Sequence, residues 1–232
     1  MKPIRSLLLV SALFALPAVA SAAAAKKAAA EAIPKLPPMS EAQALAVLNS
    51  DAGVQEKARA CQELGNYAGP KSVSALAALL SDEKLGDYAR SGLENIPDAS
   101  AGKALRDALP RLQGRQLAGA INSIGVRRDS AAVAELQKLA LDTKRGAAAE
   151  AVASLGLIGN ADAAKALQQV LASGPADVRT PAAHAALVAA EHLAKAGNAA
   201  AARKLLDAVT KALPSSFVAE TARKQAAALK GR

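Results

Sequence analysis

Residues 118–141 read AGAINSIGVRRDSAAVAELQKLAL, and residues 149–172, 31 positions later, read AEAVASLGLIGNADAAKALQQVLA. The two stretches share alanine, aliphatic, glycine and leucine positions in one register. One leucine position belongs to a longer column with steps of 31, 29, 31 and 31: Leu45, Leu76, Leu105, Leu136 and Leu167. A fixed period of this length is typical of supersecondary units that stack, because each unit buries its apolar face only against its neighbours. The sequence therefore predicts a repeat array rather than one globular core.

The composition and the spacing of apolar residues favour helices. Alanine, which has the highest helix propensity, accounts for 63 of the 232 residues, and only 2% are aromatic. No stretch shows the period-two alternation of β-branched residues that indicates a strand. In the first half of each repeat, small or aliphatic residues recur at every third position and form a narrow apolar stripe on one helical face. These stripes are Ala58/Cys61/Leu64, Ala118/Ile121/Ile124 and Ala149/Val152/Leu155.

Glycine and polar residues separate the two halves of each repeat. We predict that Gly125 and Gly156 end the first helices in a left-handed conformation, and that Asp129 and Asn160 cap the second helices. Ser40 begins a capping-box pattern and opens the array. These signals predict short turns between paired helices.

The pattern Ala-x-x-Ile/Val-x-x-Ile/Leu-Gly, a short turn with Asp or Asn, and then Ala-x-x-Leu-x-x-Leu resembles HEAT-like repeats. It is similar to the short form that also occurs in phycobilisome-lyase-type HEAT proteins. The resemblance covers about residues 40–173. It implies an all-α, armadillo-like helical fold: an α-solenoid, or superhelix, of stacked antiparallel helix pairs. It also implies that the second helix of each pair lines the face that binds partners.

The register of the repeat changes toward the C-terminus. The pair at residues 177–213 is longer than the others and resembles a TPR hairpin, with Thr180 as the expected helix cap and Pro181 in the first turn. We assign a HEAT-like array to residues 40–213 and a C-terminal capping helix to residues 214–232. Atypical terminal units are expected, because they have a neighbour on one side only.

Residues 1–22 have the composition of a signal peptide. Lys2 and Arg5 precede an apolar stretch too short to span a bilayer, and a small-residue cleavage motif ends at Ala22. We expect cleavage after Ala22 and export to the periplasm or the exterior, which would leave no membrane-spanning segment in the mature chain. An uncleaved anchor is the alternative. Residues 23–39, rich in alanine, lysine and proline, are predicted to be a flexible linker.

The charge and the cysteine content narrow the choice of partners. Cleavage after Ala22 removes two of the 29 basic residues and none of the 20 acidic ones, which leaves a net charge of +7 and favours anionic partners. Export and the lack of aromatic stacking platforms argue against nucleic acid. Cys61, the single cysteine, is expected to be a buried thiol, with an intermolecular disulfide or a reactive thiol as the alternative.

The sequence contains no recognisable catalytic constellation. His184 and His192 lie eight residues apart on one predicted helix, with Glu191 beside them, whereas helical zinc ligands are normally about four apart. Partly exposed helix histidines are therefore preferred over a metal site. No Ser-His-Asp set, Walker loop or dinucleotide-binding turn occurs. We predict no enzyme activity, no cofactor and no metal.

Polar positions that recur on the second helices are the candidate partner-binding residues. Stacking would bring them side by side on one surface; an ordinary solvated helix face is the alternative. They are Lys103, Arg106, Gln137, Lys138, Lys165 and Gln168. A local basic patch is the second candidate, with a general solubility excess as its alternative: Arg111, Arg115, Arg127 and Arg128.

Three functions remain open at this point. The leading hypothesis is a non-enzymatic scaffold of the cell envelope that presents a rigid, slightly basic surface to a protein partner. The second is a binder of an anionic envelope polymer or surface, whose affinity would fall steeply with salt. The third, by resemblance to HEAT-like lyases, is a lyase-type enzyme, and it rests on packing positions alone.

Overall fold

The computed structural model describes residues 36–67 and 69–229. Within these ranges the chain forms helices and no strand, which confirms the all-α prediction. In chain order the α-helices are α2 (Glu41–Leu48), α3 (Val54–Tyr67), α4 (Val73–Ala78), α5 (Gly86–Asn95), α6 (Ala99–Ala108), α7 (Gly114–Val126), α8 (Val133–Leu141), α9 (Ala148–Ile158), α10 (Ala161–Ser173), α11 (Ala176–Lys195), α12 (Ala199–Ala212) and α13 (Phe217–Ala228). Short 3-10 turns precede α4, α8 and α9: η1 (Pro70–Ser72), η2 (Ser130–Ala132) and η3 (Thr143–Arg145).

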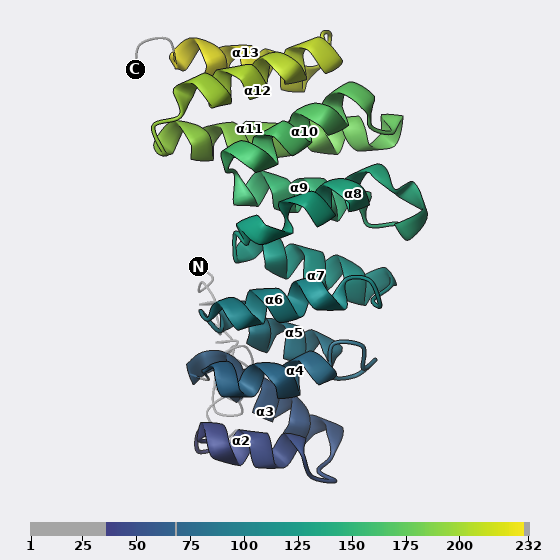
Figure 1. Ribbon diagram of the computed structural model, residues 1–232, viewed down its shortest axis with the longest axis vertical. Helices are drawn as coiled ribbons and strands as arrows, with labels where there is room; N and C mark the ends of the chain where they lie inside the picture. The colour runs from purple at the N-terminus through teal and green to yellow at the C-terminus, as the bar shows by residue number, and fades with distance from the viewer. Residues whose placement is uncertain (1–35, 68, 230–232) are drawn as a thin grey trace, which may run out of the picture. The chain divides into compact units, whose positions relative to one another are not determined.

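Residues from Met39 onward form one compact unit. Its helices alternate between two layers (Figure 1). The first-helix layer holds α3, α5, α7, α9, α11 and α13, and the second-helix layer holds α2, α4, α6, α8, α10 and α12. Each first helix from α3 to α9 packs against the next first helix along the stack, ending with α9 against α11. This stack of antiparallel pairs confirms the predicted α-solenoid. The predicted signal peptide and residues 23–35 of the predicted linker lie outside the described residues.

The predicted apolar columns form the core between the two layers. Four members of the leucine column are fully buried, whereas Leu45 in the opening helix α2 is half-buried. Ile121 and Val152, at the centres of their stripes, are also fully buried. The stripe prediction fails at Ala149, which is exposed, because α9 turns its neighbours Ala148 and Ala151 into the core instead.

The predicted polar caps are present. Asp129 accepts a hydrogen bond from the Ala131 amide, and Asn160 accepts one from the Ala163 amide at 2.8 Å. Ser40 forms the predicted capping box at the start of α2. Each cap satisfies an amide that has no partner within its own helix, which fixes where the helix begins.

The predicted role of Gly125 and Gly156 is wrong, because both glycines lie inside helices that continue past them. The left-handed residues that follow α7 and α9 are Arg128, with φ 53°, and Gly159, with φ 57°. Gly125 and Gly156 instead permit close approach of neighbouring first helices. A Cβ on Gly125 would lie 2.7 Å from Ser154 Oγ and 2.9 Å from Ser154 Cα.

The same close approach occurs along the first-helix layer. A Cβ on Gly156 would lie 2.8 Å from the carbonyl oxygen of Ala185 in α11. Between α3 and α5, a Cβ on Gly92 would lie 3.0 Å from the carbonyl oxygen of Cys61. Cys61 itself is fully buried, and this burial raises the pKa of its thiol to about 11. It is therefore a protonated core side chain in the folded chain.

The start of α11 also differs from the prediction. The helix begins at Ala176, with Pro181 inside it, so Thr180 is not its cap. Arg179 Nε donates to the Gly174 carbonyl at 3.0 Å, which ties the first turn of α11 to the end of α10. Pro181 is the sixth residue of α11 and has no amide to donate to the Asp177 carbonyl, so the helix loses one backbone hydrogen bond there.

Gly125→Ala is expected to destabilise the chain by about 1–3 kcal/mol, the usual cost of overpacking. The new methyl group would overlap Ser154, including its backbone. Helix propensity alone predicts the opposite sign, since alanine is favoured over glycine by about 1 kcal/mol. Urea unfolding measures the difference. Asn122→Ala, at an exposed position of α7, is the control and should stay within about 0.5 kcal/mol. Equal stability of the two variants would contradict the described contact between α7 and α9.

Candidate protein-binding surface

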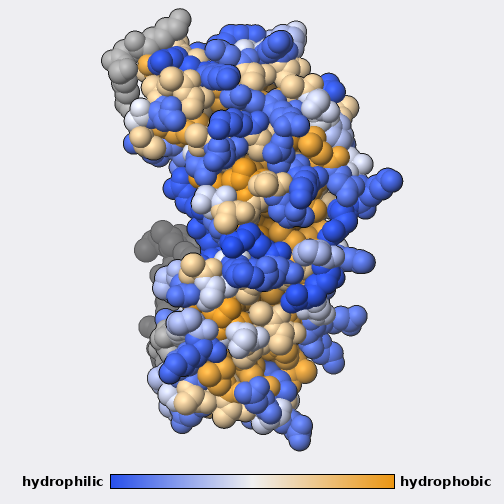
Figure 2. Space-filling model, viewed as in Figure 1, coloured by the Kyte–Doolittle hydropathy of each residue, from blue (hydrophilic) through white to orange (hydrophobic). Residues whose placement is uncertain are grey.

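Three hollows follow one another along the second-helix layer. The first, about 230 Å³, lies between α6 and η2 and includes Arg106 and Asp129. The second, about 400 Å³, lies between α8 and α10 and includes Gln137 and Lys165. The third, about 320 Å³, lies between α10 and α12 and includes Gln168. Figure 2 shows this face with hydrophilic side chains spread across it and apolar patches between them. The layer therefore presents a row of indentations with polar edges.

The lysines of the candidate surface each lie beside a carboxylate of their own helix. Lys103 Nζ is 2.6 Å from Asp107 Oδ2, Lys138 Nζ is 3.4 Å from Glu135 Oε2, and Lys165 Nζ is 2.9 Å from Asp162 Oδ1. All three lysine side chains are exposed. Such pairs add little stability, but they offset the charge of these three lysines. The third hollow differs, because Arg179 and Lys211 line it and no carboxylate among the described residues does.

The glutamines of the candidate surface lie at the edges of the hollows. Gln137 Nε2 in α8 donates to Gln169 Oε1 in α10 at 2.6 Å, which links two neighbouring second helices. Gln168 is half-buried and lies on the next hollow. The structure thus brings Gln137 and Lys165 to one hollow and Gln168 to the adjacent one, while Lys103 lies on neither.

Arg106 is engaged within the fold, unlike the other members of this set. Its guanidinium pairs with Asp129, and the two side chains are only 26% and 13% exposed. Asp129 also caps η2, so the pair ties α6 to the turn that begins the next second helix. Arg106, a candidate partner-binding residue from the sequence, therefore joins two repeats within the fold.

The four arginines of the predicted basic patch contact neighbouring repeats. Arg127 donates to the carbonyl oxygens of Leu93, Glu94 and Ile96 at the end of α5, and to that of Asp98, the N-cap of α6. Arg111 donates to the Ala77 carbonyl at 3.2 Å, and Arg128 to the Ile158 carbonyl at 3.4 Å. Arg115 pairs with Asp87. These side chains act at separate joints of the stack, and the structure does not bring them together as one cationic surface.

Arg145 belongs to the same group and was missed by the sequence reasoning. It donates to the carbonyl oxygens of Leu109 and Leu112 at 2.9 and 3.1 Å, at the end of α6. The carbonyl end of a helix attracts cations, because the last carbonyl groups have no amide partner. Arg145 lies 34 residues after Arg111, which is close to the repeat length, and this spacing could have indicated that the two arginines have similar roles.

The histidines do not form a metal site with their neighbours. Among the described residues no group of three or more His, Cys, Asp or Glu could hold a metal ion. His184 is exposed on α11, and His192 is half-buried against Gly159. Partial burial lowers the pKa of His192, and Arg128 and Lys195 lower it further, while Glu191 acts in the opposite direction. None of the helices in residues 36–67 and 69–229 is both long and apolar enough to cross a membrane.

Comparison with known families supports the repeat assignment. The model of the family described as HEAT repeats matches residues 104–188, from within α6 to within α11. The HEAT-like character of this part of the chain is therefore confirmed. No curated protein sequence matches the chain. The resemblance of α11 and α12 to a TPR hairpin stays a prediction.

Arg127→Leu is expected to lower the free energy of unfolding by about 1.5–3 kcal/mol, the range for hydrogen bonds with a charged partner. The carbonyl oxygens of Leu93, Glu94 and Ile96 at the end of α5 would lose this donor. That of Asp98 would lose it too but keeps the bond from the Ala101 amide. Arg115→Leu is the matched control, since this arginine side chain is 71% exposed and its ion pair should contribute about 1 kcal/mol or less. Chemical denaturation distinguishes the two, and equal losses would contradict the joining role of Arg127.

The lowered pKa of His192 predicts a loss of stability in mild acid. The unfolded chain binds a proton at this side chain at higher pH than the folded chain does. Stability is therefore full above pH 6.5, the ordinary value, and falls as the pH drops through the lower folded pKa. His192→Gln should flatten this part of the curve, and the exposed His184→Gln is the control. An unchanged difference between wild type and His192→Gln from pH 7.5 to pH 5 would refute the prediction.

Proposed function

We propose that this chain is an exported, non-enzymatic scaffold that binds a protein partner on its second-helix layer. HEAT repeats in general suggest protein–protein interaction, and residues 104–188 match them. The observation that supports this face is the row of three hollows between successive second helices. Export is inferred from Lys2, Arg5, the short apolar stretch and the cleavage motif at Ala22.

The chemistry of the face favours recognition by shape and hydrogen bonds. Its lysines already have carboxylate neighbours on their own helices. The attraction of these three lysines for a charged partner is therefore weakened, and affinity would come from anchors that enter the hollows. The amides of Gln137 and Gln168 offer both donors and acceptors at the hollow edges. An extended segment or loop of a partner fits a series of such hollows.

Binding of an anionic envelope polymer is the less favoured function. It depends on two basic stretches, residues 103–128 and 195–232. In the first of them the fold already uses Arg106, Arg111, Arg127 and Arg128 at its joints. A guanidinium held by carbonyl oxygens or a carboxylate is less available to a polymer. The lyase-type hypothesis gains no support from the described residues.

Site-specific photo-crosslinking in producing cells tests the proposal. A photoreactive residue at Gln137 or Gln168 should give a protein adduct outside the cytoplasm, because both positions border the hollows. The same residue at the exposed Asn122 or Val126, on α7 of the first-helix layer, is the control and should give none. Adducts from α7 alone would move the binding face to the other layer.

The salt dependence separates the protein partner from the polymer. Complex formation on the second-helix layer should persist when sodium chloride is raised from 0.1 to 0.5 M, since Lys103, Lys138 and Lys165 already lie beside carboxylates. Loss of all retention to envelope material over this range would instead favour the anionic polymer. A full-length chain found only in the cytoplasm, with residues 1–22 retained, would contradict export.

A further inference from the structure

Phe217, the first residue of α13, is the most exposed large apolar side chain that the structure describes, at 79%. The rest of the outer side of α13 is polar or small, with Glu220, Arg223 and Lys224 exposed. A polar outer side is expected for a helix that closes a repeat array. The exposed ring of Phe217 stands out from this polar side as a large apolar area that would gain by burial.

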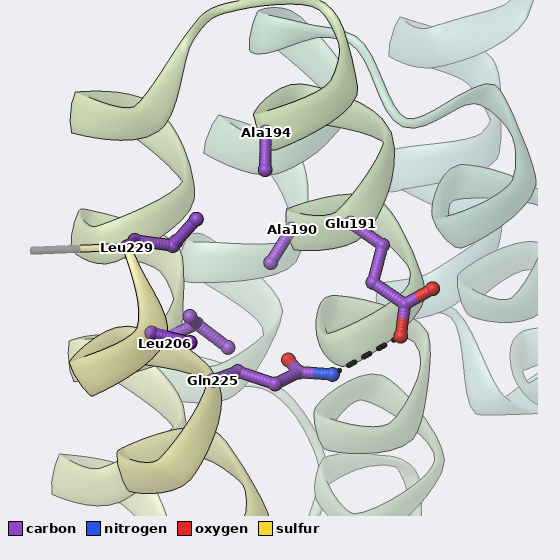
Figure 3. Close-up of a pocket in the computed structure, with 7 residues that line it drawn as sticks. Ala190, Glu191, Ala194, Leu206, Gln225 and Leu229 are labelled. Atoms are coloured by element: carbon purple, nitrogen blue, oxygen red, sulfur yellow. Dashed lines mark hydrogen bonds between the residues drawn. The ribbon is translucent and has the colours of Figure 1, made fainter. Parts of the chain in front are cut away.

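A small apolar pocket lies at the other end of α13 (Figure 3). Ala190 and Ala194 of α11, Leu206 of α12 and Leu229 line it, and its volume is about 190 Å³. A cavity of about 150 Å³ is enough to bind benzene, so the pocket can take a phenyl ring.

The side-chain oxygen of Gln225 indicates which kind of group the pocket can bind. Gln225 Nε2 donates to Glu191 Oε1 at 3.2 Å, while Gln225 Oε1 is buried and has no hydrogen-bond partner among the described residues. The edge of an aromatic ring carries partial positive charge, which suits contact with a carbonyl oxygen better than an aliphatic group does. The pocket therefore matches an aromatic side chain.

Phe217 and the pocket lie on one stripe of α13. Phe217, Thr221, Lys224 and Ala228 are spaced i, i+4, i+7 and i+11, which places them on the same helical face. Ala228 also lines the pocket. If two α13 helices pack antiparallel about a two-fold axis, position 217 of one copy faces position 228 of the other. The stripe is thus complementary to itself.

We propose that the chain forms a two-fold dimer through α13, in which Phe217 of each copy enters the α11–α13 pocket of the other. The contact is isologous, so each ring-in-pocket contact occurs twice. Lys224, near the axis, brings its own counter-charge, because its Nζ lies 2.7 Å from Glu220 Oε1.

The expected dimer is weak and reversible. α13 has 12 residues and is about 18 Å long, so two such helices bury less than the roughly 800 Å² per partner of a typical stable complex. The two rings then supply most of the affinity. Burial of one ring strengthens association about tenfold or more.

Sedimentation of the purified chain over a concentration series tests the proposal. Wild type should pass from monomer to dimer, and Phe217→Ala, which removes both rings, should weaken the dimer by about a hundredfold or more. Ala194→Leu, which fills both pockets, should weaken it similarly. Val126→Ala removes another exposed apolar side chain, 51% exposed on α7, and should leave dimerisation unchanged. Phe217 contributes little to the monomer, so unfolding of dilute Phe217→Ala should match wild type.

A mixture of the two variants gives the decisive result. Phe217→Ala keeps its pocket and Ala194→Leu keeps its ring, so their heterodimer regains one of the two contacts. The mixture should therefore associate more strongly than either variant alone and more weakly than wild type. A wild-type chain that stays monomeric at millimolar concentration, a dimer unaffected by Phe217→Ala, or a mixture no stronger than the separate variants would overturn the proposal.

Discussion

The close approach of successive first helices is the contact on which the rest of the stack depends. At Gly125 the helix α7 comes so near to Ser154 of α9 that no Cβ fits between them, and Gly156 meets Ala185 of α11 in the same way. Ser154 Oγ also donates to the Ile121 carbonyl at 2.9 Å, so a side chain of one helix bonds to the backbone of the next. Helices packed this closely need small residues at the crossing, which agrees with the high alanine content and the scarcity of aromatic rings.

Close stacking also determines the use of the arginines. Helices that end inside a stack leave carbonyl groups without amide partners, and these groups attract a cation. Arg127 serves the end of α5, Arg145 the end of α6, and Arg203 donates to the Leu229 carbonyl at 3.0 Å. Some of the arginines that give the chain its positive net charge therefore bind carbonyl oxygens at helix ends and not carboxylates. Net charge alone is a poor guide to the partner of such a chain.

The sequence predicted the features whose signals are local or periodic. The leucine column, the caps at Asp129 and Asn160 and the alternation of first and second helices follow from spacing and from local hydrogen bonding. The roles of Gly125 and Arg127 could not be predicted, because their partners lie about 30 positions away. Backbone carbonyls carry no residue type, so an arginine that binds them looks in the sequence like a free surface charge.

The candidate site was predicted in part for the same reason. Period alone placed Gln137, Lys165 and Gln168 on the second helices, and the structure puts them at the edges of hollows. Period placed Arg106 there too, yet its pairing with Asp129 depends on how a turn folds back between repeats. The sequence alone therefore cannot tell which polar residues of a column bind other repeats and which remain free to bind a partner. That distinction requires the contacts between repeats.

The hollows arise because the first helices, not the second helices, determine the spacing between repeats. First helices set the spacing of the stack through their small residues, and each second helix must accept that spacing. The second helices range from six residues in α4 and nine in α8 to 13 in α10 and 14 in α12, and their leucines pack into the core. The hollow between α8 and α10 is lined by small side chains, among them the exposed Ala134 and the buried Ala166, which do not close the gap. The packing that stabilises one layer thus leaves the other indented, and the indented layer is where a partner side chain finds room.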